Sequence, residues 1–274
     1  MPLKGFVCPL NQQNVTLEDC QNCPLPCDPL PLLATVLNTR KTIPGIYHVT
    51  EILNPRQMTY LTRKHDYYMP PDSMFEAALG TAWHQAIEKT IKEEKGEIFQ
   101  GYISEKNFKV FINGVILSGT LDLADLKHLI LWDFKTSGAY SVALFMENGW
   151  EDSTWDKYAK QTNIYRIYGF PEAKRIKLHV KIKGWDRTLA NMDIKNKIVI
   201  DVPIMDTQKV KDFVSQRIAD ILEDEKTDNP PPCTKEEMWT SKKGEPKRCL
   251  EYCGGKNFCP QFHSLQSKNI KEAI

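Results

Sequence analysis

The stretch VILSGTLDLADLKHLILWDFKT, residues 115–136, contains two apolar runs, each long enough for a β-strand, joined by the short link Lys127-His128. A link this short is typical of neighbouring antiparallel strands. Asp122 lies in the first run and Asp133 in the second. A hairpin over this stretch would therefore bring the two carboxylates close together.

The second run also carries Lys135, two residues after Asp133. Residues two apart in a strand share a face, so these two side chains should point the same way and Phe134 into the core. Two converging carboxylates can hold Mg²⁺ or Mn²⁺, which polarises a phosphate and activates water, and a lysine can stabilise developing negative charge. The alternative is a plain ion pair at a strand end.

The flanking sequence predicts an α/β domain with a mixed sheet. Asn113-Gly114 is typical of a hairpin turn, and Ser73 with Glu76 forms a capping box at a helix start. Helices are expected near residues 50–64, 73–95, 154–168 and 206–224, and strands near 98–112, 115–126, 129–136, 175–183 and 197–202. The helix at 73–95 carries an apolar stripe made of Phe75, Leu79, Trp83, Ala86 and Thr90.

Four motifs, in a fixed order, resemble the PD-(D/E)xK nuclease superfamily. The likeness is to its RecB-like branch, with the AddB nuclease domain and the CRISPR-associated RecB-like exonucleases. The motifs are G-T-A-W-H at 80–84, G-T-L-D at 119–122, W-D-F-K at 132–135 and Q-T-N-I-Y at 161–165. The resemblance covers about residues 46–202 and implies a restriction-endonuclease-like core, a mixed central sheet flanked by helices.

The same resemblance assigns roles to further residues. It implies that His84 is a metal ligand, together with the two aspartates and the backbone carbonyl oxygen of Phe134. It also implies that Gln161 and Tyr165, one helical turn apart, support the active site or contact the DNA backbone. The alternatives are an ordinary helical histidine and an amphipathic packing face.

The eight cysteines fall into two groups: Cys8, Cys20, Cys23 and Cys27, and then Cys233, Cys249, Cys253 and Cys259. A disulfide framework would suit a secreted protein, but the first residues lack the pattern of a secretory signal. Two metal sites in a reducing cytoplasm fit better. The first group has the short knuckle of a structural zinc site, with a second iron–sulfur cluster or unliganded thiols as alternatives.

The second group follows the nuclease motifs. Many RecB-like nucleases hold this segment with a [4Fe-4S] cluster, using one cysteine before the core and three after it. Here Asn54 stands where the early cysteine is expected, and Cys233 can supply the fourth ligand instead. Four thiolates suit [4Fe-4S] or Zn²⁺, and the resemblance favours iron–sulfur.

By segment, we expect a four-cysteine metal-binding knuckle at 1–28, a linker at 29–45, a RecB-like nuclease core at 46–228 and a C-terminal four-cysteine cluster segment at 229–274. The linker should make the knuckle a separate appendage. The strand at 175–183 places basic side chains on one face, either to line a DNA groove or simply to meet solvent. These are Arg175, Lys177, Lys181 and Lys183.

The composition narrows the class of protein. A net charge of +1 excludes a generally basic nucleic-acid coat protein but leaves room for a locally basic groove. No run of about 18 apolar residues is present, so a membrane span is not expected. The helicase motif G-x-x-x-x-G-K-[ST] is absent, so any unwinding would come from a helicase or another recombination or replication partner.

Together these features predict a metal-dependent DNA nuclease, an exonuclease acting on ends or single strands, in recombination, repair or replication. A restriction-type endonuclease is a weaker alternative because no separate sequence-reading domain is evident. A CRISPR spacer-processing nuclease and a catalytically silent DNA-binding or scaffold module are further alternatives. The intact set of Asp122, Asp133 and Lys135 argues against a silent module.

Overall fold

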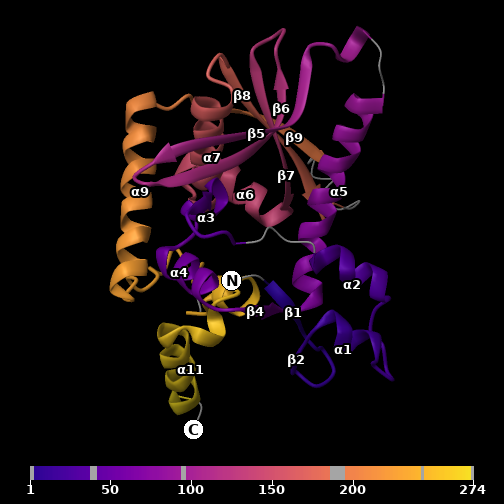
Figure 1. The fold of residues 1–274 in the computed structure, drawn as a ribbon, viewed down its shortest axis with the longest axis vertical. Coiled ribbons are helices and arrows are strands. Elements are labelled where there is room, and N and C mark those ends of the chain that lie inside the picture. The colour runs from indigo at the N-terminus through magenta and orange to yellow at the C-terminus, as the bar shows by residue number, and fades with distance from the viewer. Residues whose placement is uncertain (1–2, 38–41, 94–96, 186–194, 242–243, 273–274) are drawn as a thin grey trace. The chain divides into compact units, whose positions relative to one another are not determined.

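The computed structural model describes residues 3–37, 42–93, 97–185, 195–241 and 244–272 (Figure 1). The chain forms two compact units. Unit 1 consists of residues 1–44, 54–79 and 217–274, and unit 2 of residues 45–53 and 80–216. Two long helices, α5 (Pro71–Glu93) and α9 (Thr207–Thr227), contribute to both. The expected segments followed chain order, whereas the structure groups both termini with residues 54–79.

Unit 2 is built on a six-stranded sheet. The sheet is mixed, as predicted from the sequence, and the short strand β3 was not expected. Pairs β3–β6 and β7–β8 are parallel, and pairs β5–β6, β6–β7 and β8–β9 are antiparallel. The strands are β3 (Ile46–His48), β5 (Tyr102–Ile112), β6 (Val115–Asp125), β7 (Ile130–Gly138), β8 (Arg175–Lys183) and β9 (Lys197–Val202).

The hairpin of β5 and β6 turns at Asn113-Gly114, as the sequence predicts. Both turn residues have positive φ, 50° and 84°, which is the conformation that a two-residue hairpin turn requires. Register is continuous on both sides of the turn, from Ile112 opposite Val115 to Tyr102 opposite Asp125, with Glu105 unpaired. This turn therefore fixes which side chains of β5 lie opposite those of β6.

The edge of β6 that faces away from β5 is interrupted. Residues 116–118 pair with β3, and residues 123–125 pair with β7. Between them, residues 119–122 have no strand partner on that edge within the described chain. Asp122 ends this gap, so its side chain can reach groups other than a neighbouring strand.

Helices complete unit 2. α7 (Ser153–Gly169) packs against β5, β6, β7 and β8, and Figure 1 shows it beside the sheet. The others are α3 (Val49–Ile52), α6 (Ala139–Asn148) and the 3-10 helices η1 (Glu97–Phe99) and η2 (Gly149–Glu151). The core contains fully buried aliphatic side chains from strands and α7: Leu117, Leu121, Leu131, Ile164 and Leu178.

In unit 1 the N-terminal segment is part of a core. β1 (Leu3–Val7) pairs antiparallel with β2 (Asn14–Val15) and parallel with β4 (Tyr67–Met69). α1 (Leu17–Gln21) and α2 (Leu30–Leu37) follow. Buried Phe6, Leu33, Val36 and Met74 form one hydrophobic cluster. The expected separate appendage is therefore wrong, because its strand and its apolar side chains pack against later segments.

The rest of unit 1 joins α4 (Arg56–Lys64) to the C-terminal segment. Arg56 Nε donates a 2.8 Å hydrogen bond to Asp224, whose side chain is almost fully buried. Tyr60 and Leu61 of α4 cluster with Cys259 and Phe262. The C-terminal helices are α10 (Lys247–Glu251), the 3-10 helix η3 (Lys256–Phe258) and α11 (Pro260–Glu272).

Three helical expectations need correction. The helix expected over 50–64 is two helices, α3 and α4, because Pro55 lies between them. The helix expected from Ser73 begins at Pro71, since proline is favoured in the first turn. Its apolar stripe is not buried: Leu79 is 62% and Trp83 48% exposed. No helix in the described residues has the length and hydropathy needed to cross a membrane.

Candidate metal centre

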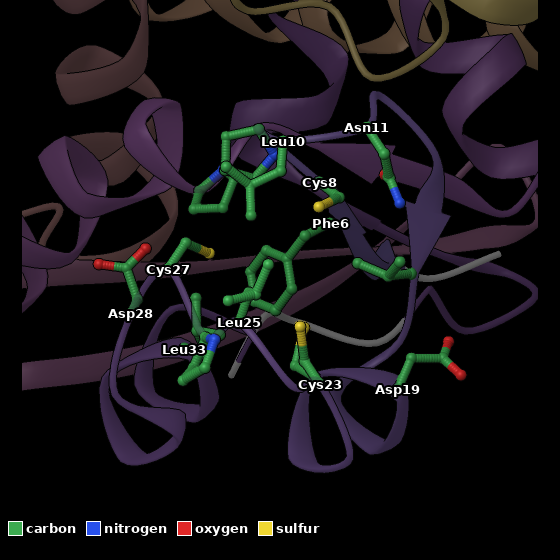
Figure 2. Close-up of a pocket in the computed structure, with 15 residues that line it drawn as sticks. Phe6, Cys8, Leu10, Asn11, Asp19, Cys23, Leu25, Cys27, Asp28 and Leu33 are labelled. Atoms are coloured by element: carbon green, nitrogen blue, oxygen red, sulfur yellow. The ribbon is translucent and has the colours of Figure 1, made fainter.

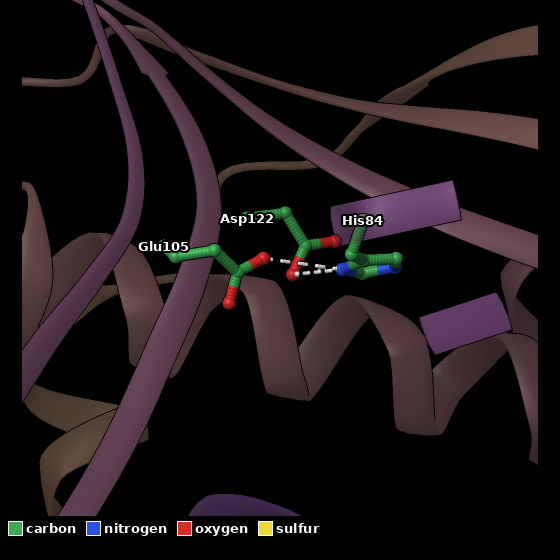
Figure 3. Close-up of side chains that lie close together, drawn as sticks. All are labelled: His84, Glu105 and Asp122. Carbon is green, nitrogen blue, oxygen red and sulfur yellow. Dashed lines mark ion pairs between the residues drawn. The ribbon is translucent and has the colours of Figure 1, made fainter. Parts of the chain in front are cut away.

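Three side chains from three elements converge in unit 2 (Figure 3). His84 comes from α5, Glu105 from β5 and Asp122 from β6. His84 Nδ1 lies 3.4 Å from Glu105 Oε1 and 3.4 Å from Asp122 Oδ1. One potential ligand atom from each residue lies within 4.8 Å of the other two. This imidazole and two carboxylates are a donor set that divalent cations accept.

The backbone of Phe134 holds this group in place. Its amide donates a 2.7 Å hydrogen bond to Asp122 Oδ2, and its carbonyl oxygen lies 3.3 Å from His84 Nε2. The Phe134 ring also meets the His84 ring edge-on, with 6.0 Å between centroids. The Phe134 backbone of β7 reaches Asp122 where residues 119–122 of β6 have no strand partner, within the described chain, on the edge that faces away from β5. This interruption therefore lets the β7 backbone orient two candidate ligands, Asp122 and His84.

The charge state of His84 reflects its two acidic neighbours. Burial by itself lowers the pKa of the imidazole, but hydrogen bonds and charge interactions with Asp122 and Glu105 raise it to about 10. The histidine is therefore a cation at neutral pH in the metal-free protein. Its positive charge sits beside the carboxylates that a divalent cation would neutralise.

Asp133 and Lys135 form an ion pair, with Lys135 Nζ 2.6 Å from Asp133 Oδ2. Asp133 is only 1% exposed, and its Oδ1 has no hydrogen-bond partner among the described residues. Burial raises the pKa of Asp133, Lys135 opposes that shift, and the negative charge of Asp122 adds to it. Because a buried, unpartnered carboxylate oxygen is costly, Asp133 fits a role as a cation ligand.

The orientation of this strand corrects one expectation. Asp133 is more buried than Phe134, which is half-buried and also contacts the ring of His179. The aspartate and lysine thus occupy the inner face of β7, and Phe134 the other face. Asp133 lies outside the 4.8 Å group of His84, Glu105 and Asp122, and it pairs with Lys135.

Gln161 and Tyr165 lie together on α7, as their spacing predicts. Gln161 Nε2 donates a 2.8 Å hydrogen bond to the Tyr165 hydroxyl, and both side chains are buried. Burial raises the pKa of Tyr165 to about 12, despite the opposing charge of Lys135. The phenol therefore stays neutral and can donate a hydrogen bond near the carboxylates.

A glycine allows α7 to approach the sheet at this point. A Cβ atom on Gly119 would lie 2.4 Å from the ring of Phe108 and 3.1 Å from that of Tyr165. We expect Gly119→Ala to lower the free energy of unfolding by about 1–3 kcal/mol, the usual cost of overpacking. Gly101→Ala is the matched control, since its Cβ would make only ordinary contacts with Lys127. Urea unfolding checks both, and an unchanged midpoint for Gly119→Ala would contradict this account.

Glu105 is the residue that sequence reasoning missed. It is one of the few non-glycine residues with positive φ, 48°, so its backbone is held in a strained conformation beside the site. A signal was nevertheless present. Counting back from the turn at Asn113-Gly114 places Glu105 opposite Asp122 in the hairpin.

The sequence matches no family model and no curated protein. The structure is similar to the crystal structure of SSO0001, with a TM-score of 0.51 and 16% sequence identity. The alignment covers 84% of this chain and 94% of that chain. At this identity the likeness establishes a shared fold.

The basic face of β8 lies opposite an acid. Arg175 Nη2 lies 3.3 Å from Asp201 Oδ1, and Lys177 Nζ lies 3.1 Å from the same atom. Asp201 is on β9, directly opposite Lys177. Lys181 is exposed on the same strand. DNA contacts by this face, Lys183 included, stay a prediction, and Arg175 and Lys177 already have an acidic partner.

The C-terminal cysteines surround one small pocket in unit 1. It is lined by Gln57 and Leu61 of α4 and by all four thiols, Cys233, Cys249, Cys253 and Cys259. Burial raises the pKa of Cys233 to about 12 and that of Cys249 to about 11. Neutral thiols are thus favoured without a metal, and a bound cation would supply the charge that thiolates need.

The N-terminal cysteines line a second pocket in unit 1, of about 90 Å³, together with the buried side chains of Phe6 and Leu33. Figure 2 shows Cys8, Cys23 and Cys27 around it. No three thiols of the described residues come within 4.8 Å of one another in either set. A zinc ion bound at ~2.3 Å to each sulfur would need them closer, at about 3.8 Å.

Proposed function

We propose that this protein is a Mg²⁺- or Mn²⁺-dependent deoxyribonuclease that hydrolyses phosphodiester bonds at DNA ends or in single strands. The observation that carries the proposal is the convergence of His84, Glu105 and Asp122 beside the buried pair Asp133–Lys135. The motif resemblance to RecB-like nucleases supports it, and recombination, repair or replication would be its setting.

The site residues divide into those that would bind the cation and those that would stabilise the phosphate. His84, Glu105, Asp122 and Asp133 would hold the cation, together with the Phe134 carbonyl oxygen. The bound cation polarises the phosphate and lowers the pKa of a water molecule. Lys135 stabilises negative charge that develops on the phosphate, since its two acidic neighbours keep it protonated. The Gln161–Tyr165 pair positions a neutral donor on the same side.

Metal groups at the cysteines belong to the same proposal. The C-terminal thiols would hold a [4Fe-4S] cluster, because four of them line one pocket and the motif resemblance favours iron–sulfur. The N-terminal set of four cysteines would hold zinc, on the chemistry of its donors. Both need a reducing compartment, so we place the protein in the cytoplasm, with any DNA unwinding left to a partner.

The test is cleavage of end-labelled single- and double-stranded DNA by aerobic and anaerobic preparations, with Mg²⁺, Mn²⁺ or EDTA. We expect cleavage with either metal and none in EDTA. Product ladders from each end give the polarity. Binding without cleavage under every condition would instead indicate a silent DNA-binding module.

Substituting a candidate ligand should change the metal concentration that cleavage requires, whereas substituting a residue away from the site should not. In His84→Ala and Glu105→Gln we expect the Mn²⁺ concentration for half-maximal cleavage to rise about 10- to 100-fold, the effect of losing a charge-assisted contact. Excess Mn²⁺ should restore part of the activity. Glu172→Gln, an exposed position in unit 2, is the control. A Glu105→Gln enzyme with the wild-type Mn²⁺ dependence would remove Glu105 from the ligand set.

A further inference from the structure

An open apolar pocket of about 450 Å³ lies on α5 in unit 2. Trp83, Ile87 and Ile91 form the helix wall, and Phe99, Tyr102 and Leu123 contribute to the opposite side. The volume falls in the range of roughly 300–1,000 Å³ that small-molecule sites occupy. Of the apolar stripe identified from the sequence, Trp83, Ala86 and Thr90 thus line an open pocket, whereas Phe75 packs against a core cluster.

The pocket and the candidate metal centre are built from the same three elements. Trp83 immediately precedes His84 on α5, and Leu123 immediately follows Asp122 on β6. Tyr102 lies on the same strand as Glu105. Each of the three elements that supply a candidate ligand therefore also supplies a wall of the pocket.

The lining selects the chemistry of its occupant. None of the described residues that line the pocket carries a charge, so they offer a phosphate no cationic partner. Three are aromatic, and Trp83 is 48% exposed, which leaves ring surface open to solvent. A nucleobase is a flat, neutral ring system that stacks on such surfaces whatever its identity. The pocket thus suits a base, and the metal centre a phosphate, of one DNA strand.

We propose that this pocket is a subsite for one unpaired nucleobase of the DNA strand whose phosphate lies at the metal centre. The inference rests on the proposed nuclease function and specifies its substrate. A base within a duplex is paired and stacked, so it cannot enter without leaving the helix. The substrate is therefore single-stranded DNA or an unpaired end, read without sequence preference.

The test combines a protein change with a matching DNA change. Trp83→Leu and Tyr102→Leu are compared with Phe111→Leu, which removes an exposed aromatic ring of β5 outside the pocket. Short single strands carry one abasic nucleotide, moved through each position from the cleaved end. In the wild type we expect one or two neighbouring positions to raise KM about tenfold, the effect of losing one stacked base.

If the effects of Trp83→Leu and of the abasic position on KM do not add, the ring of Trp83 contacts the base at that position. Trp83→Leu should raise KM by a similar factor on intact DNA, and the sensitive abasic position should cost little more in that variant. Additive losses, or a Trp83→Leu enzyme that behaves like Phe111→Leu, would overturn the subsite. If Trp83→Leu fails to fold, the abasic scan of the wild type still decides, because a flat profile contradicts a base pocket.

A second readout separates this inference from the nuclease proposal. In EDTA, 2-aminopurine at the sensitive position should lose fluorescence on binding the wild type and keep it with Trp83→Leu. Cleavage with unquenched 2-aminopurine at every position would defeat the subsite alone. Quenching without cleavage in any metal would defeat the nuclease proposal and leave a base-binding pocket.

Discussion

Lys135→Met should abolish DNA cleavage and destabilise unit 2, and adding Asp133→Asn should restore much of the stability without restoring cleavage. The single change leaves the carboxylate of Asp133, 1% exposed, without its cationic partner. Breaking a buried ion pair from one side costs about 3–5 kcal/mol, whereas replacing both charges is often neutral. Loss of charge stabilisation on the phosphate should cost at least about 10²–10³-fold in rate.

The double variant is what makes this result interpretable, because a folded and inactive protein cannot owe its inactivity to unfolding. Urea unfolding and single-turnover cleavage are measured on the same preparations. Glu172→Gln again provides the surface control. Wild-type cleavage by the double variant would remove both residues from the catalytic site. A double variant less stable than Lys135→Met would show that the pair itself stabilises the fold.

Local patterns in the sequence were enough to place most of the candidate site. The strict alternation of residues 175–183 gave the bounds of β8. The Asn113-Gly114 turn set the register of β5 against β6. That register places Glu105, which sequence reasoning missed, opposite Asp122. Turn geometry and the two-residue period of a strand depend on only a few neighbouring residues, so both can be predicted from the sequence.

Side-chain direction in β7 was harder to predict. The strand reads ILWDFKTSG and is flanked by β6 and β8, with apolar side chains on both of its faces. A pattern of this kind does not show which face is the inner one. The aspartate and lysine proved to be on the inner face, where burial raises the pKa of Asp133.

Long-range pairings were beyond local patterns altogether. β1 pairs with β4, which places Leu3 opposite Tyr67. The sequence around either residue does not indicate this pairing. The same holds for Asp201, which meets Lys177 only through the register of β8 and β9. Such contacts depend on how distant segments of the chain assemble. The sequence therefore did not show that an acidic residue faces the basic strand, or that the N-terminal segment pairs with β4.

Cys259→Ser should remove iron from the protein and unfold the C-terminal part of unit 1. Cys259 is buried among Tyr60, Leu61 and Phe262, and it lines the pocket with three other thiols. The α4 face that carries Gln57 closes the same pocket, so a cluster there would tie α4 to α11. Structural zinc in small domains contributes on the order of 10–16 kcal/mol, which is comparable with the whole stability of a domain, and a cluster held by four thiolates should likewise dominate folding of this segment.

The matched variant is Cys23→Ser, in the exposed part of the N-terminal set. It should lose zinc and keep iron, whereas Cys259→Ser should lose iron and its visible absorbance and accumulate as insoluble protein. Measuring iron and zinc per chain after anaerobic purification reports the occupancy of both cysteine sites in one experiment. Iron retained in Cys259→Ser, or a wild type that contains zinc alone, would overturn the C-terminal cluster.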